Sequence, residues 1–352
     1  MPLLEEIWQS RILTNGGVML QRFEAALSRY LNVEHITIVS NASLGLVLAL
    51  REFGITGEVI TSPFSFVATS HAIRWAGAEP VFADIDPLTL NLDPASVEAR
   101  ITPKTQAIMA VHCYGAPCDT EGLAEIARKH GLRLIYDAAH AFGVRKAGKP
   151  LVAEGDLSIL SFHATKVFHS FEGGAIISPT REMKLRLDRL ANFGIEDEVT
   201  VSSTGLNTKM SELHAAMGLA MLPKVDEIIE ARDQVAGRYW SGLSQVQGLR
   251  CLCPPGQKGH NSYAFPILVG PEYPMPRDAL YHRLREHNIY ARRYFYPLIS
   301  DMPMYQMLPS AAPAGLPIAR RSAERILCLP LYPDLDRVAQ DKIIRVVADP
   351  CH

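Results

Sequence analysis

The sequence predicts an α/β protein with a mainly parallel sheet flanked by helices, followed by a smaller C-terminal α+β domain. Between residues 36 and 178, short apolar runs typical of buried strands alternate with helical stretches. A Cys-Pro-Pro-Gly segment at 253–256 has the composition of a linker. The chain has 352 residues, 48% of them hydrophobic, which is enough for a large core and two domains. We therefore expect an N-terminal arm (1–31), a large domain (32–250) and a small domain (251–352).

The elements of the first half follow from the spacing of apolar residues. Two helices are expected within 1–31, separated by the turn Asn15-Gly16-Gly17. Strands are expected at 36–39, 58–61, 81–84, 107–111, 132–136, 157–162 and 175–177. Helices are expected at 44–53, after Asp93-Pro94, and at 120–130. This alternation favours a parallel, doubly wound sheet.

The second half is predominantly helical before the linker. Helices are expected at 181–191, 213–222 and 225–246. Beyond the linker, we expect a strand at 260–269 and a helix at 277–287.

Composition excludes several classes of function. The net charge is −2, so no basic excess favours nucleic-acid binding. No run of about 18 apolar residues predicts a transmembrane helix, and no cationic start precedes an apolar stretch. The six cysteines lack the paired spacing of zinc ligands, so no metal site is expected. We expect a cytoplasmic protein that binds neither nucleic acid nor membrane.

Lys166 lies on a short loop between two predicted strands, in the segment SFHATKVFHSFEGG (161–174). Lysines are mostly exposed, so a surface position is the plain alternative. Loops held between strands often carry catalytic side chains, however, and a desolvated lysine becomes a nucleophilic amine. Such an amine forms a Schiff base with a carbonyl compound or with pyridoxal phosphate.

Asp137 follows the predicted strand at 132–136, in the segment DAAHA. A carboxylate at a strand's carboxyl end can keep the ring nitrogen of pyridoxal phosphate protonated. Asp is also common as a helix N-cap, and the two roles are compatible.

A second strand-to-helix junction, Ser40-Asn41-Ala42-Ser43, has the form of an anion site. Free backbone amides and the helix dipole at such a junction favour a phosphate group. An ordinary N-cap remains the alternative here.

Taken together, DAAHA, SFHATK and Glu172-Gly173-Gly174 resemble the DegT/DnrJ/EryC1/StrS family of sugar aminotransferases. The similarity covers nearly the whole chain. The resemblance implies the fold type I of pyridoxal-phosphate enzymes, as in aspartate aminotransferase, and a homodimer with shared active sites. The implied cofactor is pyridoxal 5'-phosphate, with pyridoxamine phosphate as an intermediate form.

The resemblance also implies cofactor contacts for several residues. Lys166 would carry the cofactor as an internal aldimine, and Asp137 would face its ring nitrogen. The remaining implied contacts are Ala42 (backbone), Ser43 and Ser161 at the phosphate, Phe66 stacked on the ring, His140 near its phenolic oxygen, and Asn207 of the partner subunit. Phe66 could instead be a core residue with Phe64 as the stacking ring, His140 a buried core histidine, and Asn207 a turn residue.

The segment Arg292-Arg293-Tyr294 resembles the part of the small domain that faces the nucleotide sugar. Two arginines beside aromatic rings suit a diphosphate and a base, and a solvated basic turn is the alternative.

The implied reaction moves an amino group, with glutamate as the expected donor, to a keto-sugar on a nucleoside diphosphate. The motifs around Lys166 and Arg292-Arg293-Tyr294 most resemble those of members that act on dTDP-linked 3-keto- or 4-keto-6-deoxyhexoses. Such members serve deoxyamino sugar biosynthesis, as for a lipopolysaccharide O-antigen. Alternatives are a sugar dehydratase using the same cofactor, another fold type I enzyme, and a cofactor-bound regulatory protein. The related dehydratases carry histidine at the position of Lys166, which favours amination.

Overall fold

The computed structural model describes residues 2–252, 254–256 and 259–349. Its centre is a seven-stranded sheet with the order β1-β9-β8-β5-β4-β2-β3. The strands are β1 (His35–Val39), β2 (Glu58–Thr61), β3 (Glu79–Phe82), β4 (Thr105–Val111), β5 (Arg133–Asp137), β8 (Leu157–Ser161) and β9 (Gly174–Ser178). A separate hairpin is formed by β6 (Arg145–Lys146) and β7 (Lys149–Pro150). The α/β class with a mainly parallel sheet is confirmed.

One strand departs from the parallel arrangement expected between 36 and 178. Strand β9 runs antiparallel to both of its neighbours, β1 and β8, whereas β3, β2, β4, β5 and β8 are mutually parallel. The reason lies in the connection, because a parallel neighbour needs a crossover of a dozen or more residues, usually a helix. The loop from β8 to β9 forms no helix and turns straight back, so β9 returns in the opposite direction.

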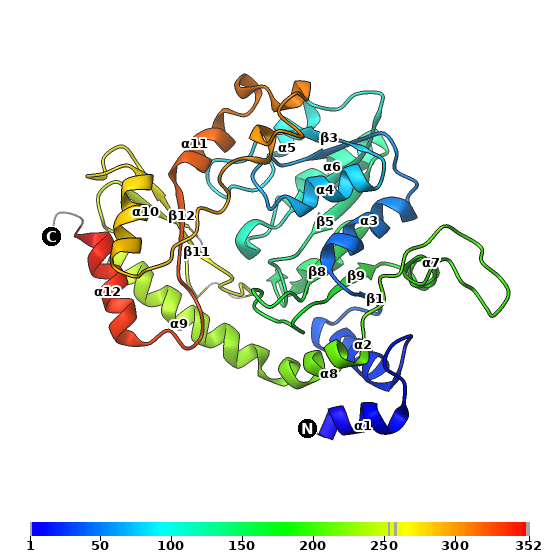
Figure 1. The fold of residues 1–352 in the computed structure, drawn as a ribbon. Coiled ribbons are helices and arrows are strands. Elements are labelled where there is room, and N and C mark those ends of the chain that lie inside the picture. The colour runs from blue at the N-terminus through cyan, green and yellow to red at the C-terminus, as the bar shows by residue number, and fades with distance from the viewer. Residues whose placement is uncertain (1, 253, 257–258, 350–352) are drawn as a thin grey trace.

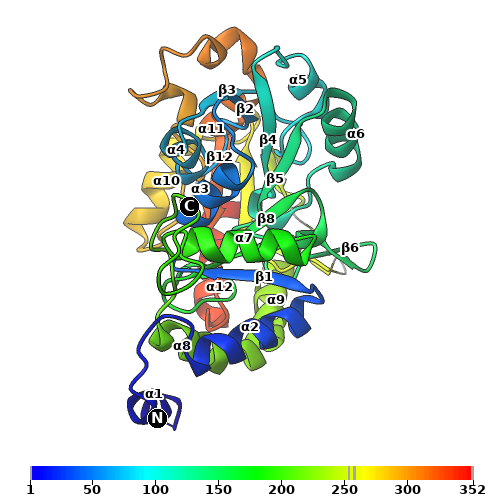
Figure 2. The ribbon, with the colours of Figure 1, turned by 90° about the vertical axis from the view of Figure 1, so that its right-hand side faces the viewer.

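Helices cover both faces of this sheet (Figures 1 and 2). One face packs against α3 (Ala42–Glu52), α4 (Ala68–Trp75) and α7 (Arg181–Ala191). The other face packs against α5 (Pro94–Glu98) and α6 (Thr120–His130), and beside them against α2 (Val18–Leu31) and α8 (Glu212–Met221). Helix α1 (Pro2–Ser10) lies at the end of the molecule that carries the N-terminus (Figure 1).

The C-terminal part contains a smaller antiparallel sheet, as the α+β expectation requires. It has the order β10-β11-β12, from β10 (Leu249–Cys251), β11 (Phe265–Val269) and β12 (Ile326–Leu329). Helices α9 (Val225–Leu243), α10 (Arg277–Glu286) and α12 (Arg337–Ala348) share its core, and α11 (Pro317–Arg325) precedes β12. The domain bounds at 31/32 and 250/251 stay predictions, and Cys253 of the expected linker lies outside the described residues.

Two predicted strands differ most in position from the observed ones. The strand expected at 81–84 lies at 79–82, and the strand expected at 260–269 begins only at Phe265. Residues His260–Ala264 form a loop in which Ser262 has a φ of 45°. A left-handed residue of this kind interrupts a strand. Among the described residues, no helix is both long and apolar enough to cross a bilayer.

Candidate active site

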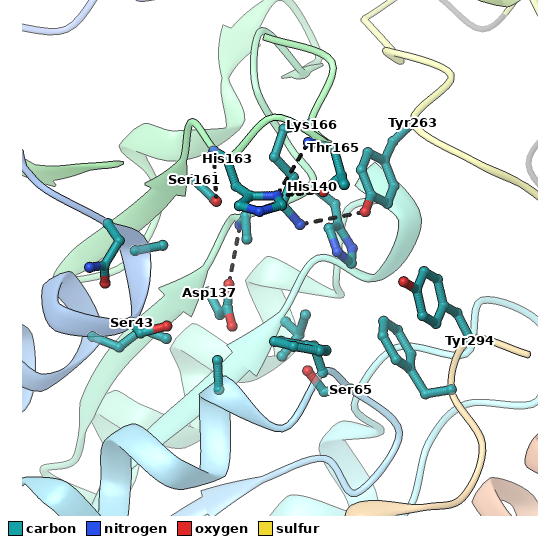
Figure 3. A pocket seen from close by; sticks show the side chains of 18 of the residues that line it. Ser43, Ser65, Asp137, His140, Ser161, His163, Thr165, Lys166, Tyr263 and Tyr294 are labelled. Atoms are coloured by element: carbon teal, nitrogen blue, oxygen red, sulfur yellow. Dashed lines mark hydrogen bonds between the residues drawn. The ribbon is translucent and has the colours of Figure 1, made fainter. Parts of the chain in front are cut away.

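A cavity of about 270 Å³ lies where β4, β5 and β8 end, at the carboxyl edge of the sheet. Open α/β sheets bind ligands at this edge. Eight of the predicted site residues line it: Ala42, Ser43, Phe66, Asp137, His140, Ser161, Lys166 and Tyr294. Figure 3 shows how several of these side chains converge from different elements on one space.

Lys166 reaches into the cavity from the loop between β8 and β9. Its backbone amide donates to the carbonyl of His163 at 2.9 Å, which fixes the turn that carries it. Burial lowers the pKa of its ammonium group to about 8, and the charge of Asp137 opposes this shift. The side chain therefore becomes a neutral, nucleophilic amine at a lower pH than an ordinary lysine does.

Asp137 ends β5 and is buried. The hydroxyl of Thr69, on α4, donates to its Oδ2 at 2.8 Å, and the amide of Ala139 donates to its Oδ1 at 3.2 Å. Burial raises the pKa of the carboxyl group, while these two donors and the charge of Lys166 oppose the rise. Ser65 extends the chain of hydroxyls, with its Oγ 2.9 Å from Thr69 Oγ1.

His140 forms one wall of the cavity and is buried. Its Nδ1 accepts from the amide of Tyr114 at 3.3 Å. Burial first, and the nearby positive Lys166 second, keep its pKa well below the usual value, so the imidazole is neutral. The ring stacks on Tyr263 at a centroid distance of 4.1 Å.

The strand-to-helix junction that was predicted to bind a phosphate group is formed by the first turn of α3. Asn41 is its N-cap, accepting from the amide of Leu44 at 2.9 Å, and Ala42 and Ser43 follow. The first amides of a helix have no partner within it and attract anions. Gly174 lets β9 approach this turn, because a Cβ there would lie 2.8 Å from the Ala42 nitrogen. Ser161, at the end of β8, lines the same cavity.

The two candidate stacking phenylalanines lie in different places. Phe66 lines the cavity and is 58% exposed, so its ring is available to a ligand. Phe64 is buried and packs edge-on against Tyr114 and Phe295. The position of Phe66 is the one that suits a stacking contact.

Three predicted residues are not among those lining the cavity. Asn207 is exposed and pairs through its backbone with Asn192. Arg292 is exposed, with its backbone hydrogen-bonded to Cys328. Arg293 donates to Asp278 at 3.0 Å and stacks on Tyr281, so its charge is already engaged within the small domain. Within one chain these three lie outside the site, and their predicted roles stay predictions.

Several residues that line the cavity or contact its lining residues were missed from the sequence. Ser65 and Phe295 stand beside residues that were singled out, Phe66 and Tyr294, and that proximity was the available signal. Thr69 contacts Asp137 from a helix 68 residues earlier in the chain. Tyr263 lies within the strand predicted at 260–269, and nothing in the sequence indicated its contact with Lys166, which lies 97 residues away.

The residues present fit pyridoxal phosphate. An amine of lowered pKa, a buried carboxylate and the amide-rich first turn of α3 face one cavity, with Phe66 exposed in its wall. These match the aldehyde, the ring nitrogen, the phosphate and the flat ring of the cofactor. The donor set of this chain therefore suits each part of the cofactor.

Comparison with known proteins gives the same result. Residues 1–348 match the DegT/DnrJ/EryC1/StrS aminotransferase family. The chain is 46% identical over 348 residues to the dTDP-4-amino-4,6-dideoxy-D-glucose transaminase of Shigella dysenteriae, covering 99% of this chain and 94% of that protein.

Solved structures agree with the sequence matches. A crystal structure of DesI in the presence of its TDP-sugar product superposes with a TM-score of 0.92 at 35% identity, covering 99% of this chain and 90% of that one. NtdA from Bacillus subtilis, with bound cofactor PMP, superposes with a TM-score of 0.89 at 28% identity, covering 98% and 80% respectively.

Proposed function

The chain belongs to the DegT/DnrJ/EryC1/StrS aminotransferase family, and from that premise we propose that it aminates a dTDP-linked 4-keto-6-deoxyhexose with glutamate as donor. The protein is a pyridoxal-phosphate-dependent aminotransferase with a nucleotide-sugar substrate. The observation that carries the proposal is the convergence of Lys166, Asp137 and the first turn of α3 on one cavity.

Each group of the site has a separate task. Pyridoxal phosphate supplies an aldehyde that bonds to amines and a ring that stores electrons when a carbon loses its proton. Lys166 would hold the cofactor through Nζ. Asp137 would keep a proton on the ring nitrogen, because an ionised carboxylate accepts a strong charge-assisted hydrogen bond from it. Ser43, Ser161 and the amides of α3 would hold the phosphate.

Lys166 also moves the proton. Burial lowers the pKa of Nζ to about 8. When it is not bonded to the cofactor, this amine would take a proton from one carbon and return it to another. The amine has to be neutral to act as a base, so this step weakens as the pH falls below the pKa. His140 stays neutral beside it and adds no competing positive charge.

The choice of sugar rests on the relatives. The Shigella dysenteriae protein is named as a transaminase of dTDP-4-amino-4,6-dideoxy-D-glucose, and DesI was crystallised with a TDP-sugar product. We therefore favour the 4-keto over the 3-keto sugar. Tyr294 and Phe295 line the cavity, and aromatic side chains suit a sugar ring or a base.

A homodimer is part of the proposal. Large apolar side chains are exposed on α1 and α8 and in the segments that precede α2 and α8: Trp8, Leu13, Phe193, Val201 and Leu213. Exposed apolar patches are typical of association surfaces, and in the proposed dimer these side chains would lie in the interface. Asn207 belongs to the same region and would reach the cavity of a second copy. A cytoplasmic location is also part of the proposal, to be tested by cell fractionation.

The proposal is tested by loading the purified chain with pyridoxal phosphate and recording its visible spectrum. We expect a lysine-bound cofactor band that disappears when glutamate is added, and no such band in Lys166→Ala. Addition of dTDP-4-keto-6-deoxyglucose should then restore the band and yield an amino sugar. A chain that takes up no cofactor, or a loaded chain that accepts no keto-sugar nucleotide, would contradict it.

A further inference from the structure

We propose that Tyr263 is a catalytic residue of this site, whose ring shields the Lys166 amine from water and whose hydroxyl holds Nζ while the lysine is free of the cofactor. The inference rests on the proposed function and adds a residue to it.

Tyr263 touches the reacting nitrogen itself. Lys166 Nζ lies 3.4 Å from the Tyr263 hydroxyl and 5.1 Å from the centre of its ring (Figure 3). The hydroxyl thus approaches the end of the lysine side chain, and the ring covers its flank. A cation within about 6 Å of an aromatic ring is also attracted to it, so the charged lysine keeps this position too.

The backbone around Tyr263 is clamped to the cofactor side of the molecule. Asn261 donates through Nδ2 to the carbonyls of His140 and Phe142, at 2.8 and 3.1 Å, and accepts from the Tyr263 amide at 3.2 Å. Arg232, from α9, donates to the carbonyls of Ser262 and Tyr263 at 3.0 and 2.6 Å. Asn261 and Arg232 are buried, so Tyr263 is anchored on both sides.

The side chain is fixed as well. The Tyr263 ring stacks on His140 with 13° between the planes. His140 is one of the proposed cofactor contacts, and Tyr263, stacked on it, lines the same cavity beside Lys166. A ring held on one face by stacking, with its backbone anchored, presents its hydroxyl at a defined point.

The hydroxyl suits a lysine that works as a base. Burial is the main cause of a strong rise in the pKa of Tyr263, so the group remains a neutral phenol. A phenol oxygen can accept one N–H of the neutral amine. The nitrogen lone pair is then left to point into the cavity. Without that contact, the long lysine side chain has several rotamers, and small misplacements slow proton transfer strongly.

The other titratable groups lining the cavity are Asp137, His140, His163, Glu172 and Tyr294. Asp137 raises the pKa of Lys166, and burial lowers it by more. His163 lies 3.6 Å from the carboxylate of Glu172, so these two side chains face each other. The covering that Tyr263 provides is part of the burial that sets the lysine pKa.

The test uses two variants that separate ring from hydroxyl. Tyr263→Phe removes only the hydroxyl, and Tyr263→Ala removes the ring as well. Tyr290→Phe is the matched control, because Tyr290 is 59% exposed and lies outside the cavity. Each full-length chain is studied without cofactor, by the pH dependence of Lys166 acylation measured by mass spectrometry. Each is then studied with cofactor, by the rate at which glutamate removes the visible band.

We expect the acylation of Lys166 to follow a pKa of about 8 in the unchanged chain, in Tyr263→Phe and in Tyr290→Phe. In Tyr263→Ala water reaches the amine, and the pKa rises toward the ordinary value of lysine. With cofactor bound, Tyr263→Phe should keep its band yet react with glutamate at least about tenfold more slowly. That slowing should persist at pH values where Lys166 is neutral.

Two results would overturn the proposal. One is a Tyr263→Phe variant that reacts with glutamate as fast as the unchanged enzyme. The other is a folded Tyr263→Ala variant whose lysine titrates as in the unchanged chain. A chain that failed to bind pyridoxal phosphate would refute the proposed function. Acylation needs no cofactor, so the pH dependence of Lys166 acylation would still test whether Tyr263 shields the amine from water.

Discussion

Thr69→Val is expected to shift the acid limb of the pH profile to higher pH. The threonine hydroxyl donates to Asp137 Oδ2 at 2.8 Å within a buried environment. Valine has nearly the same shape but no donor. Removing the donor destabilises the ionised carboxylate, because burial already favours its neutral form. Since Asp137 has to be ionised to hold the ring-nitrogen proton, activity should fail at a higher pH than before.

The size of the shift follows from the strength of the lost contact. A hydrogen bond to a charged group contributes about 1.5–3 kcal/mol. One pKa unit corresponds to about 1.4 kcal/mol. The pKa of Asp137 should therefore rise by about one to two units, and the acid limb of the rate profile should move by a similar amount.

The same change affects stability with a defined sign. The folded-state pKa of Asp137 lies above its ordinary value, so folding becomes less favourable as the pH rises from the unfolded to the folded pKa. Thr69→Val should enlarge this loss. The cofactor-free variant should lose about 1.5–3 kcal/mol at neutral pH, and clearly less at a pH below both pKa values.

The assay is the initial rate of glutamate-dependent band loss, measured across the acid-to-neutral range. Thr37→Val is the matched control, because Thr37 is also buried and its hydroxyl donates to the carboxylate of Asp188 at 2.6 Å. Thr37 lies on β1 and Asp188 on α7, and neither lines the cavity. It should lose stability without moving the profile. A Thr69→Val profile that coincides with that of the unchanged enzyme would refute the assigned role of the Thr69–Asp137 contact.

Three further outcomes are expected. Lys166→Arg should fold with a lowered melting temperature, because a guanidinium stays protonated and burial here disfavours a positive charge; it should show no lysine-bound band and no turnover, and measurable turnover would contradict this. Gly174→Ala should weaken cofactor binding in a spectroscopic titration and cost about 1–3 kcal/mol in denaturant unfolding, because its Cβ would meet the Ala42 nitrogen; unchanged affinity would argue against a cofactor phosphate there. Glu212→Ala should cost about 1–3 kcal/mol, since its carboxylate accepts from the amides of Met19 and Leu20 at the start of α2; proteolysis should then cut the N-terminal arm faster, and an unchanged cutting rate would speak against this clamp.

The sequence was sufficient for most of the fold. Periodicity located α6 and α7 with the observed bounds, and the alternation of elements predicted the mainly parallel sheet. It could not give the reversed direction of β9, which follows a loop from β8 that forms no helix. It also placed a strand over His260–Ala264, where contacts from Asn261 and Arg232 hold an irregular loop instead.

The candidate site was predictable where local motifs carry the chemistry. Lys166, Asp137 and the Ala42-Ser43 turn stand in recognisable strand-to-loop junctions, and all line the cavity. Tyr263 and Thr69 were not predictable, because their roles arise from contacts between residues 97 and 68 positions apart. Arg293 pairs with Asp278, which the sequence did not indicate, and its ligand contact stays a prediction.

The most direct test of the central claim follows the nitrogen atom. The cofactor-loaded enzyme is incubated with dTDP-4-keto-6-deoxyglucose and glutamate carrying heavy nitrogen, and the sugar nucleotide is analysed by mass spectrometry. We predict a dTDP-4-amino-4,6-dideoxyhexose that contains the heavy nitrogen, together with an equal amount of 2-oxoglutarate. An unchanged keto-sugar, or one that has lost water without gaining nitrogen, would contradict the account.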